Sequence, residues 1–220
     1  MLNKFTKYSG IILITSSLIF LITEFITAAT CPEPYSYTQN FISNLGVRGP
    51  SVMFGQHIES PLSWLMNSGF IIFGVLSFLG ILLTPTLNNK NRKVKITLSF
   101  LAMIGVVLVG LFHGSQEALL DGTGMYHSMG AFLSFISGNI LIIILSTGIL
   151  NNSLRRKLIR LGSFGLFCTL AYVIILMMSI DDNPIRIIGL IERGAVYPFL
   201  FGLIYYGNYL NNHQTKKSAN

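Results

Sequence analysis

The stretch LSWLMNSGFIIFGVLSFLGILLT, residues 62–84, contains no charged residue and decides the fold class. An α-helix needs about 20 predominantly apolar residues to cross the hydrocarbon core of a bilayer, and this stretch is long enough. The alternating strands of about ten residues that are typical of a membrane β-barrel do not occur in the sequence. Five further stretches have the same apolar character. We therefore predict an all-α, single-domain, polytopic helix bundle with six transmembrane helices at residues 9–29, 62–84, 96–112, 125–150, 161–180 and 187–210.

The overall composition also indicates an integral membrane protein. Of the 220 residues, 51% are hydrophobic and 10% are charged, and the mean hydropathy is +0.62. In soluble domains about a quarter of the residues are charged. The net charge of +7 does not indicate nucleic-acid binding, because the Lys and Arg residues form short clusters between apolar stretches and not one basic face. We expect the lipid bilayer as a partner, and no nucleic acid.

The basic clusters predict the orientation of the chain. Under the six-span topology, twelve of the fifteen basic residues fall on one side: Lys4, Lys7, Lys90, Arg92, Lys93, Lys95, Arg155, Arg156, Lys157, Arg160, Lys216 and Lys217. By the positive-inside rule this side is cytoplasmic. We therefore predict a multi-pass protein of the plasma membrane with both termini in the cytoplasm. The eight acidic residues and three of the four histidines then fall at or near the outer face.

One long loop, from Thr30 to Pro61, connects the first two predicted spans. Within it, roughly residues 37–45 place Phe41, Ile42 and Leu45 at helical spacing, and Gly46 follows as a stop signal. We predict a short helix that lies at the outer interface of the membrane.

A titratable stretch, HGSQEALLDGTGMYH at residues 113–127, joins the third and fourth predicted spans. If the third helix continues past the membrane, His113, Glu117 and Asp121 share one face, and His127 returns close to them. Two histidines with a carboxylate could form the first shell of a zinc site. One hypothesis is therefore a metal-dependent intramembrane hydrolase with His113, Glu117 and His127 as ligands and Asp121 or Glu192 as general base. The other interpretation is that these are solvated polar residues at the boundary of a span.

A second pair of charged residues, Glu192 and Arg193, lies inside the sixth predicted span. Ionisable groups at such a depth are costly and usually face the interior of a bundle with a partner. Because the two side chains are adjacent in sequence, they diverge on a helix, so we expect each to have a different partner. Glu24, high in the first span, could join the outer polar cluster or simply face lipid headgroups. The structural interpretation is that these side chains snorkel to the interface or form a buried ion pair that fixes helix register.

These residues lead to our main functional hypothesis, an outward-facing polar pocket that binds a small molecule or lipid headgroup. Its residues are Arg48, Glu117, His127, Glu192 and Arg193. In this hypothesis the two arginines attract an anionic or zwitterionic ligand, and no cofactor is required. An accessory membrane subunit that docks a protein partner is a further alternative, and the sequence identifies no such partner.

Three motifs resemble a known family: YSYTQNFISNLG (35–46), GMYHSMGAFLSF (124–135) and GLIERGAVYPFL (189–200). Together they are similar to a prokaryotic family of six-helix membrane proteins known as domain of unknown function 998. The resemblance implies the six-helix fold and draws attention to Ser43, Leu45, Gly46, His127, Glu192 and Arg193. Asn44 stands where the family often has aspartate. The resemblance implies no reaction.

Overall fold

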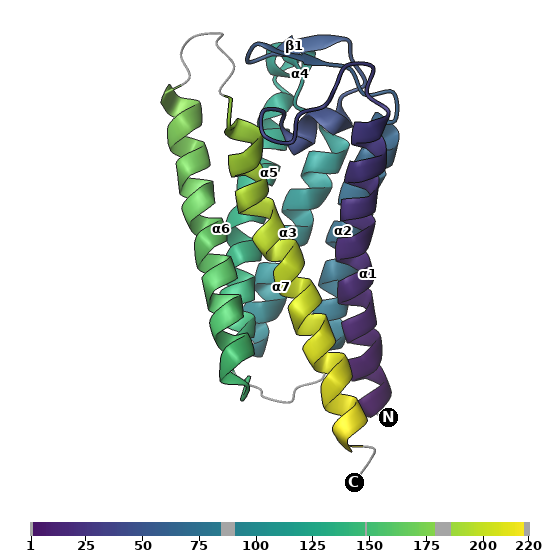
Figure 1. Cartoon of the computed structure of the whole chain (residues 1–220), viewed down its shortest axis with the longest axis vertical. Helices are drawn as coiled ribbons and strands as arrows, with labels where there is room; N and C mark the ends of the chain where they lie inside the picture. The colour runs from purple at the N-terminus through teal and green to yellow at the C-terminus, as the bar shows by residue number, and fades with distance from the viewer. Residues whose placement is uncertain (1, 85–90, 148, 179–185, 218–220) are drawn as a thin grey trace.

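The structure is a computed structural model that describes residues 2–84, 91–147, 149–178 and 186–217, without the side chains of residues 2–3, 178 and 213–217. Within this part it contains six long helices (Figure 1): α1 (Leu2–Ala29), α2 (Ser63–Leu83), α3 (Arg92–Leu111), α5 (Gly124–Leu145), α6 (Asn152–Met178) and α7 (Ile188–Lys217). Each of the six includes a segment long and apolar enough to cross a membrane. The predicted all-α, six-span membrane bundle is confirmed.

Helix α6 begins earlier than the span predicted from the sequence. The predicted fifth span begins at residue 161, whereas α6 begins at Asn152 and includes the basic run at residues 155–160. The side chain of Asn151 accepts hydrogen bonds from the backbone N–H groups of Ser153 and Leu154, at 2.9 and 3.2 Å. This side chain caps the free amides of the first turn, so the helix starts before its apolar part.

The helices pack so that α7 closes the bundle against α1. Neighbours along the chain contact one another, and α7 also contacts α1 and α5. In Figure 1 the first turn of α1 and the last turns of α7 lie at the same end of the bundle. Backbones approach closely where small residues face each other, because a Cβ atom at Gly105 of α3 would lie only 2.6 Å from the carbonyl oxygen of Gly130 in α5.

The loop of residues 30–62, called here the capping loop, covers the opposite end. It contains a 3-10 helix, η1 (Ile42–Gly46), and an antiparallel hairpin of β1 (Ser51–Met53) and β2 (Gln56–Ile58). The predicted short helix therefore exists, but as a 3-10 turn that starts later than expected, and the hairpin was not predicted. Ile42 and Leu45 are fully buried among the helices. The capping loop is thus a plug in the end of the bundle, and a short helix α4 (Gln116–Asp121) lies beside it (Figure 1).

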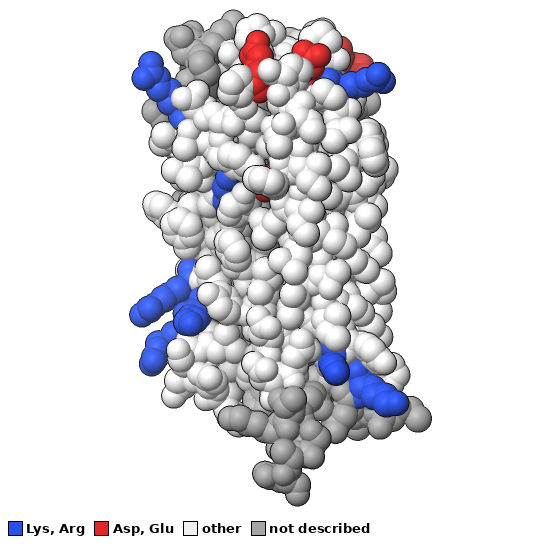
Figure 2. Space-filling view, turned by 45° about the vertical axis from the view of Figure 1, so that its right-hand side comes forward, with Lys and Arg blue, Asp and Glu red and all other residues white. Residues whose placement is uncertain are grey.

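Charged side chains divide between the two ends of the bundle. Figure 2 shows acidic side chains at the end that carries the capping loop, and most of the visible basic side chains toward the other end. Lys90, Asp181 and Asp182 lie outside the described residues, as do the side chains of Lys216 and Lys217. The side of the membrane on which each end lies, and the assignment to the plasma membrane, stay predictions.

Candidate functional site

Arg193 is the centre of a buried polar cluster between α1, α7 and the capping loop. Its side chain is 4% exposed and forms an ion pair with Glu24, with 2.8 Å between Nη2 and Oε1. Nη1 donates to the carbonyl oxygens of Tyr37, Asn40 and Gly189 at 2.8–3.1 Å, and Nη2 also donates to the hydroxyl of Tyr35 at 2.6 Å. All three guanidinium nitrogens are therefore engaged within the protein.

The acidic partner in this cluster is equally well satisfied. Glu24 is 1% exposed, and besides Arg193 it accepts hydrogen bonds from the hydroxyl of Tyr197, at 3.0 and 3.1 Å. Burial raises the pKa of Tyr35, so its hydroxyl stays protonated and donates to the carbonyl of Phe41 at 2.8 Å. A buried charge pair is tolerated only when its remaining hydrogen-bonding groups are paired, and this cluster meets that condition.

Glu192 contacts a different part of the capping loop. Its carboxylate is buried and accepts hydrogen bonds from the backbone N–H groups of Ile42 and Ser43, at the beginning of η1. The residue before η1, Phe41, has no side chain that could cap these amides. Glu192 supplies from α7 the acceptor that the loop lacks, and its negative charge suits the positive end of a helical turn.

The expectation that Glu192 and Arg193 have different partners is confirmed, but their expected role as ligand-binding residues is not supported. Both side chains are buried, and they form their hydrogen bonds with other groups of the protein. Arg48 is exposed and lies in the capping loop, between η1 and the hairpin. The two arginines therefore do not form a common anion-binding site, and the structural interpretation of the buried pair fits the contacts.

His127 and Glu192 line one small cavity inside the bundle, beneath η1. Its volume is about 40 Å³, and its other lining residues are mostly Phe, Val and Ala. Nδ1 of His127 lies 2.7 Å from the carbonyl oxygen of Phe112. Glu117, by contrast, is exposed and lines a different pocket. The structure therefore separates the five residues of the predicted pocket: Glu192 and Arg193 are buried, His127 is half-buried, and Arg48 and Glu117 are exposed.

The proposed zinc ligands are not brought together. Helix α3 ends at Leu111, and the chain is extended at Phe112 before α4 begins with Ser115 as its cap, so His113 and Glu117 do not share a continuous helix face. Among the described residues, no three His, Cys, Asp or Glu side chains are placed to hold a metal ion. Hydrogen bonds from Thr123 lower the pKa of Asp121, which is occupied as a turn acceptor. The geometry gives the hydrolase hypothesis no support.

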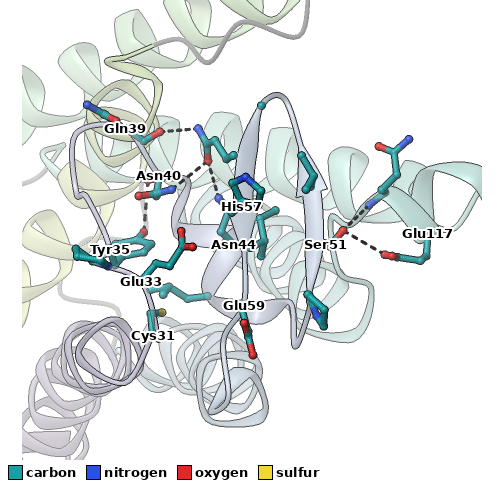
Figure 3. Close-up of a pocket in the computed structure, with 18 residues that line it drawn as sticks. Cys31, Glu33, Tyr35, Gln39, Asn40, Asn44, Ser51, His57, Glu59 and Glu117 are labelled. Atoms are coloured by element: carbon teal, nitrogen blue, oxygen red, sulfur yellow. Dashed lines mark hydrogen bonds between the residues drawn. The ribbon is translucent and has the colours of Figure 1, made fainter.

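A polar pocket of about 590 Å³, called here the hairpin pocket, lies in the capping loop (Figure 3). It lies between residues 31–40, η1, the hairpin and the start of α4. Three carboxylates line it, those of Glu33, Glu59 and Glu117. The remaining lining residues are Cys31, Pro34, Tyr35, Gln39, Asn40, Asn44, Leu45, Pro50, Ser51, Val52, Gly55, Gln56, His57, Ile58 and Gln116.

A chain of amide hydrogen bonds forms the inner wall of this pocket. Nε2 of Gln56 donates to the carbonyl oxygen of Gln39 at 2.7 Å, and its Oε1 accepts from Nδ2 of Asn44 at 2.6 Å. Asn44 is only 5% exposed, and its buried Oδ1 has no hydrogen-bond partner among the described residues. A buried acceptor without a partner is unusual in proteins and requires an explanation, such as an ordered water or a bound donor.

Sequence reasoning missed most of the hairpin pocket. Glu33, Glu59 and His57 were recognised only as outer polar residues, because nothing in the sequence shows that the chain folds back at Phe54 and Gly55. Both of these residues have positive φ, of 51° and 68°, which the glycine adopts readily and the phenylalanine does not. The available signal was the density of polar side chains in a loop that also carries buried apolar residues.

Comparison with known proteins gives one family. The model of the family described as protein of unknown function (DUF998) matches residues 14–207. The chain belongs to the DUF998 family. The match covers nearly all of the six-helix bundle and the whole capping loop, as the resemblance implied. Neither a curated protein nor a solved structure shows significant similarity to the chain.

In this DUF998 chain, the three motifs that carried the resemblance meet in one region. The first contributes Tyr35 and Ile42, the second His127, and the third Glu192 and Arg193. Bonds between the first and third motifs hold the capping loop in place beneath the hairpin pocket, whereas Nδ1 of His127 lies against the carbonyl oxygen of Phe112. The first and third motifs thus fix the floor of that pocket.

Proposed function

We propose that this membrane protein binds a small polar molecule or a lipid headgroup in the hairpin pocket. The observation that carries the proposal is a polar pocket of ligand size with a buried, unpartnered acceptor in its wall. A volume of about 590 Å³ lies within the range of small-molecule sites. The wall contributes both carboxylates and fixed amides, the types of group that orient a polar ligand.

Preorganisation supports the proposal. Arg193 and Glu192 hold residues 37–43 to α7, and the buried Ile42 and Leu45 anchor η1 among the helices. The hairpin is connected to α4 through Ser51, whose hydroxyl lies 3.4 Å from Glu117 Oε2 and 3.4 Å from the backbone N of Gln116. A pocket whose walls are fixed before binding loses less entropy when the ligand binds. The buried charges thus contribute to binding through the position of the walls.

The experiment uses a substitution that fills the pocket. Val52 lines it and is 50% exposed, so Val52→Trp can be accommodated without disturbing the core. Val94, 46% exposed in α3 near the opposite end, gives the matched control Val94→Trp. The purified protein in detergent is titrated with 1,4-diaminobutane, 1,4-butanediol and succinate, which share a four-carbon chain and differ in charge.

We expect at least one of these probes to bind saturably to the wild type and to Val94→Trp, as measured by calorimetry and by a rise in Tm. Val52→Trp should lose that binding while its Tm without probe stays unchanged. Absence of binding by all three probes, or unchanged binding to Val52→Trp, would overturn the proposal.

A further inference from the structure

The charged residues of the hairpin pocket all have the same sign. Glu33, Glu59 and Glu117 line it, and no Lys or Arg is among the described lining residues. Within the part of the chain that the structure describes, none of the three carboxylates forms an ion pair, since the buried Glu24–Arg193 pair lies elsewhere. Figure 3 shows Glu33 reaching from the segment near Tyr35 toward the hairpin. The field in the pocket therefore favours a cation and opposes an anion.

The hydrogen-bonding groups of the inner wall lead independently to the same conclusion. The carbonyl oxygen of Gln39 can only accept, so the side-chain amide of Gln56 must point its nitrogen at it. Oε1 of Gln56 then accepts from the nitrogen of Asn44, which leaves Oδ1 of Asn44 as the free end of the chain. The order of donors fixes both amide orientations. The chain of amides therefore ends at an acceptor that lacks a donor, so the partner that would complete it is a donor.

From these two observations we infer that the ligand of the hairpin pocket is a small organic cation with N–H donors, such as a primary ammonium group. This inference rests on the proposed function and names the ligand class for the same pocket. The carboxylates of Glu33 and Glu59 would neutralise the charge of the ammonium, and its N–H groups are the type of donor that Oδ1 of Asn44 lacks. A free amine and the ethanolamine headgroup of a lipid share this chemistry. This cationic ligand class replaces the anionic or zwitterionic ligand that the two arginines led us to expect from the sequence.

The first experiment compares the three probes on matched variants. In detergent, 1,4-diaminobutane should bind at least about tenfold more tightly than 1,4-butanediol, and succinate should not bind saturably. Glu33→Gln combined with Glu59→Gln should lower the affinity for the diamine by about tenfold and leave that for the diol unchanged, because only the charge is removed. Asp121→Asn is the control, since Asp121 is an exposed acid of α4 outside the pocket. It should change the diamine affinity by less than about twofold.

A comparison of two membrane lipids distinguishes a free amine from a lipid headgroup as the source of the cation. In nanodiscs of phosphatidylethanolamine, compared with phosphatidylglycerol, a weaker apparent affinity for free ethanolamine would identify the lipid headgroup as a competitor. Equal affinities in the two lipids would identify a free amine as the ligand. Either result requires that the ammonium group itself binds.

Cys31 provides a second, independent measurement because its thiol lines the pocket. In a Cys168→Ala background, Cys31 is modified by 2-aminoethyl methanethiosulfonate or by the negatively charged 2-sulfonatoethyl reagent. In each case the thiolate attacks the sulfenyl sulfur, a mixed disulfide forms and methanesulfinate leaves. Burial raises the pKa of Cys31 and slows both reactions alike, so the ratio of the two rates reports the local charge. The comparison site is Leu119→Cys in α4, in a chain without Cys31, where residue 119 is 48% exposed and outside the pocket.

We expect the ratio of cationic to anionic rates at Cys31 to exceed that at Leu119→Cys by about tenfold. Glu33→Gln with Glu59→Gln should bring the two ratios together. If the diol or succinate binds as well as the diamine, or if the anionic reagent reacts faster at Cys31, the cation inference is wrong while ligand binding in the pocket survives. If no probe binds at all, the proposed function itself fails.

Discussion

Replacing Arg193 by Met should destabilise the protein more than any substitution of an exposed charge. The change keeps the length of the side chain and removes a guanidinium that bonds to Glu24, to Tyr35 and to three backbone carbonyls. Glu24 is 1% exposed and, among the described residues, would keep the hydroxyl of Tyr197 as its hydrogen-bond donor. The variant therefore leaves an uncompensated carboxylate inside the bundle.

The expected magnitude follows from that unpaired charge. Removing one partner of a buried ion pair usually costs about 3–5 kcal/mol. Glu24→Gln should cost less, because its amide oxygen still accepts from Tyr197 and from the guanidinium. The double variant should be more stable than the sum of the two single effects predicts, by about 1–3 kcal/mol. Arg193→Lys retains the positive charge but not the planar fork, so it should rescue only part of the loss.

The assay is reversible unfolding in mixed micelles, combined with hydrogen exchange of residues 35–46. In Arg193→Met, the amides of this segment should exchange faster than those of α3, because the lost contacts hold the loop and not the distant helix. A loss of stability below about 1 kcal/mol, or additive effects in the double variant, would refute the role assigned to the pair. Loss of stability without a change in exchange at residues 35–46 would refute the connection to the capping loop.

Two further substitutions test other parts of the structure. Gly165→Ala should lower the free energy of unfolding by about 1–3 kcal/mol in the same assay. The added Cβ would lie 2.0 Å from Oδ1 of Asn139, in the packed interface of α5 and α6. The control Ser163→Ala, on an exposed face of α6, should have little effect. Ser115→Ala should raise the pKa of Glu117, which hydrogen bonds from Ser115 and other groups hold below its usual range. Because the folded protein favours the charged carboxylate, Glu117 stabilises the fold at pH values above the pKa it has in the unfolded chain. This stabilisation is lost as the pH falls through the lower pKa that Glu117 has in the folded protein. An NMR titration of the Glu117 carboxyl carbon measures the change, and an unaltered pKa in the Ser115→Ala variant would contradict it.

The fold could be predicted from the sequence because bilayer energetics act on whole segments. A run such as residues 62–84 has no stable alternative to a helix in lipid, so length and composition suffice. The capping loop follows different rules. Its strands have three residues each, too few for an alternating pattern to show, and the turn at Phe54 and Gly55 lacks a common hairpin sequence. Ile42 and Leu45 were correctly recognised as apolar, yet their burial among helices depends on tertiary contacts.

The candidate site was predictable only in its charged residues. Glu192 and Arg193 attract attention because charge is rare and costly inside a span. Their partners could not be derived: Glu24 is separated from Arg193 by 169 positions, and Glu192 accepts from backbone N–H groups, which every residue except proline possesses. His113 and Glu117 illustrate the opposite error. Their spacing of four suggested a shared helix face, but Gly114 and Ser115 interrupt the helix between them.

The arrangement of Glu192 and Arg193 explains why two adjacent and opposite charges suit this position in α7. A chain entering a helical turn presents carbonyl oxygens before the turn and free N–H groups at its start. Arg193 binds the carbonyls of Tyr37 and Asn40, and Glu192 binds the amides of Ile42 and Ser43. The order of charges on α7 therefore matches the order of backbone polarity in the loop. A shift of the loop along α7 would place carbonyls against the carboxylate and amides against the guanidinium, so the pair fixes one register and with it the floor of the hairpin pocket.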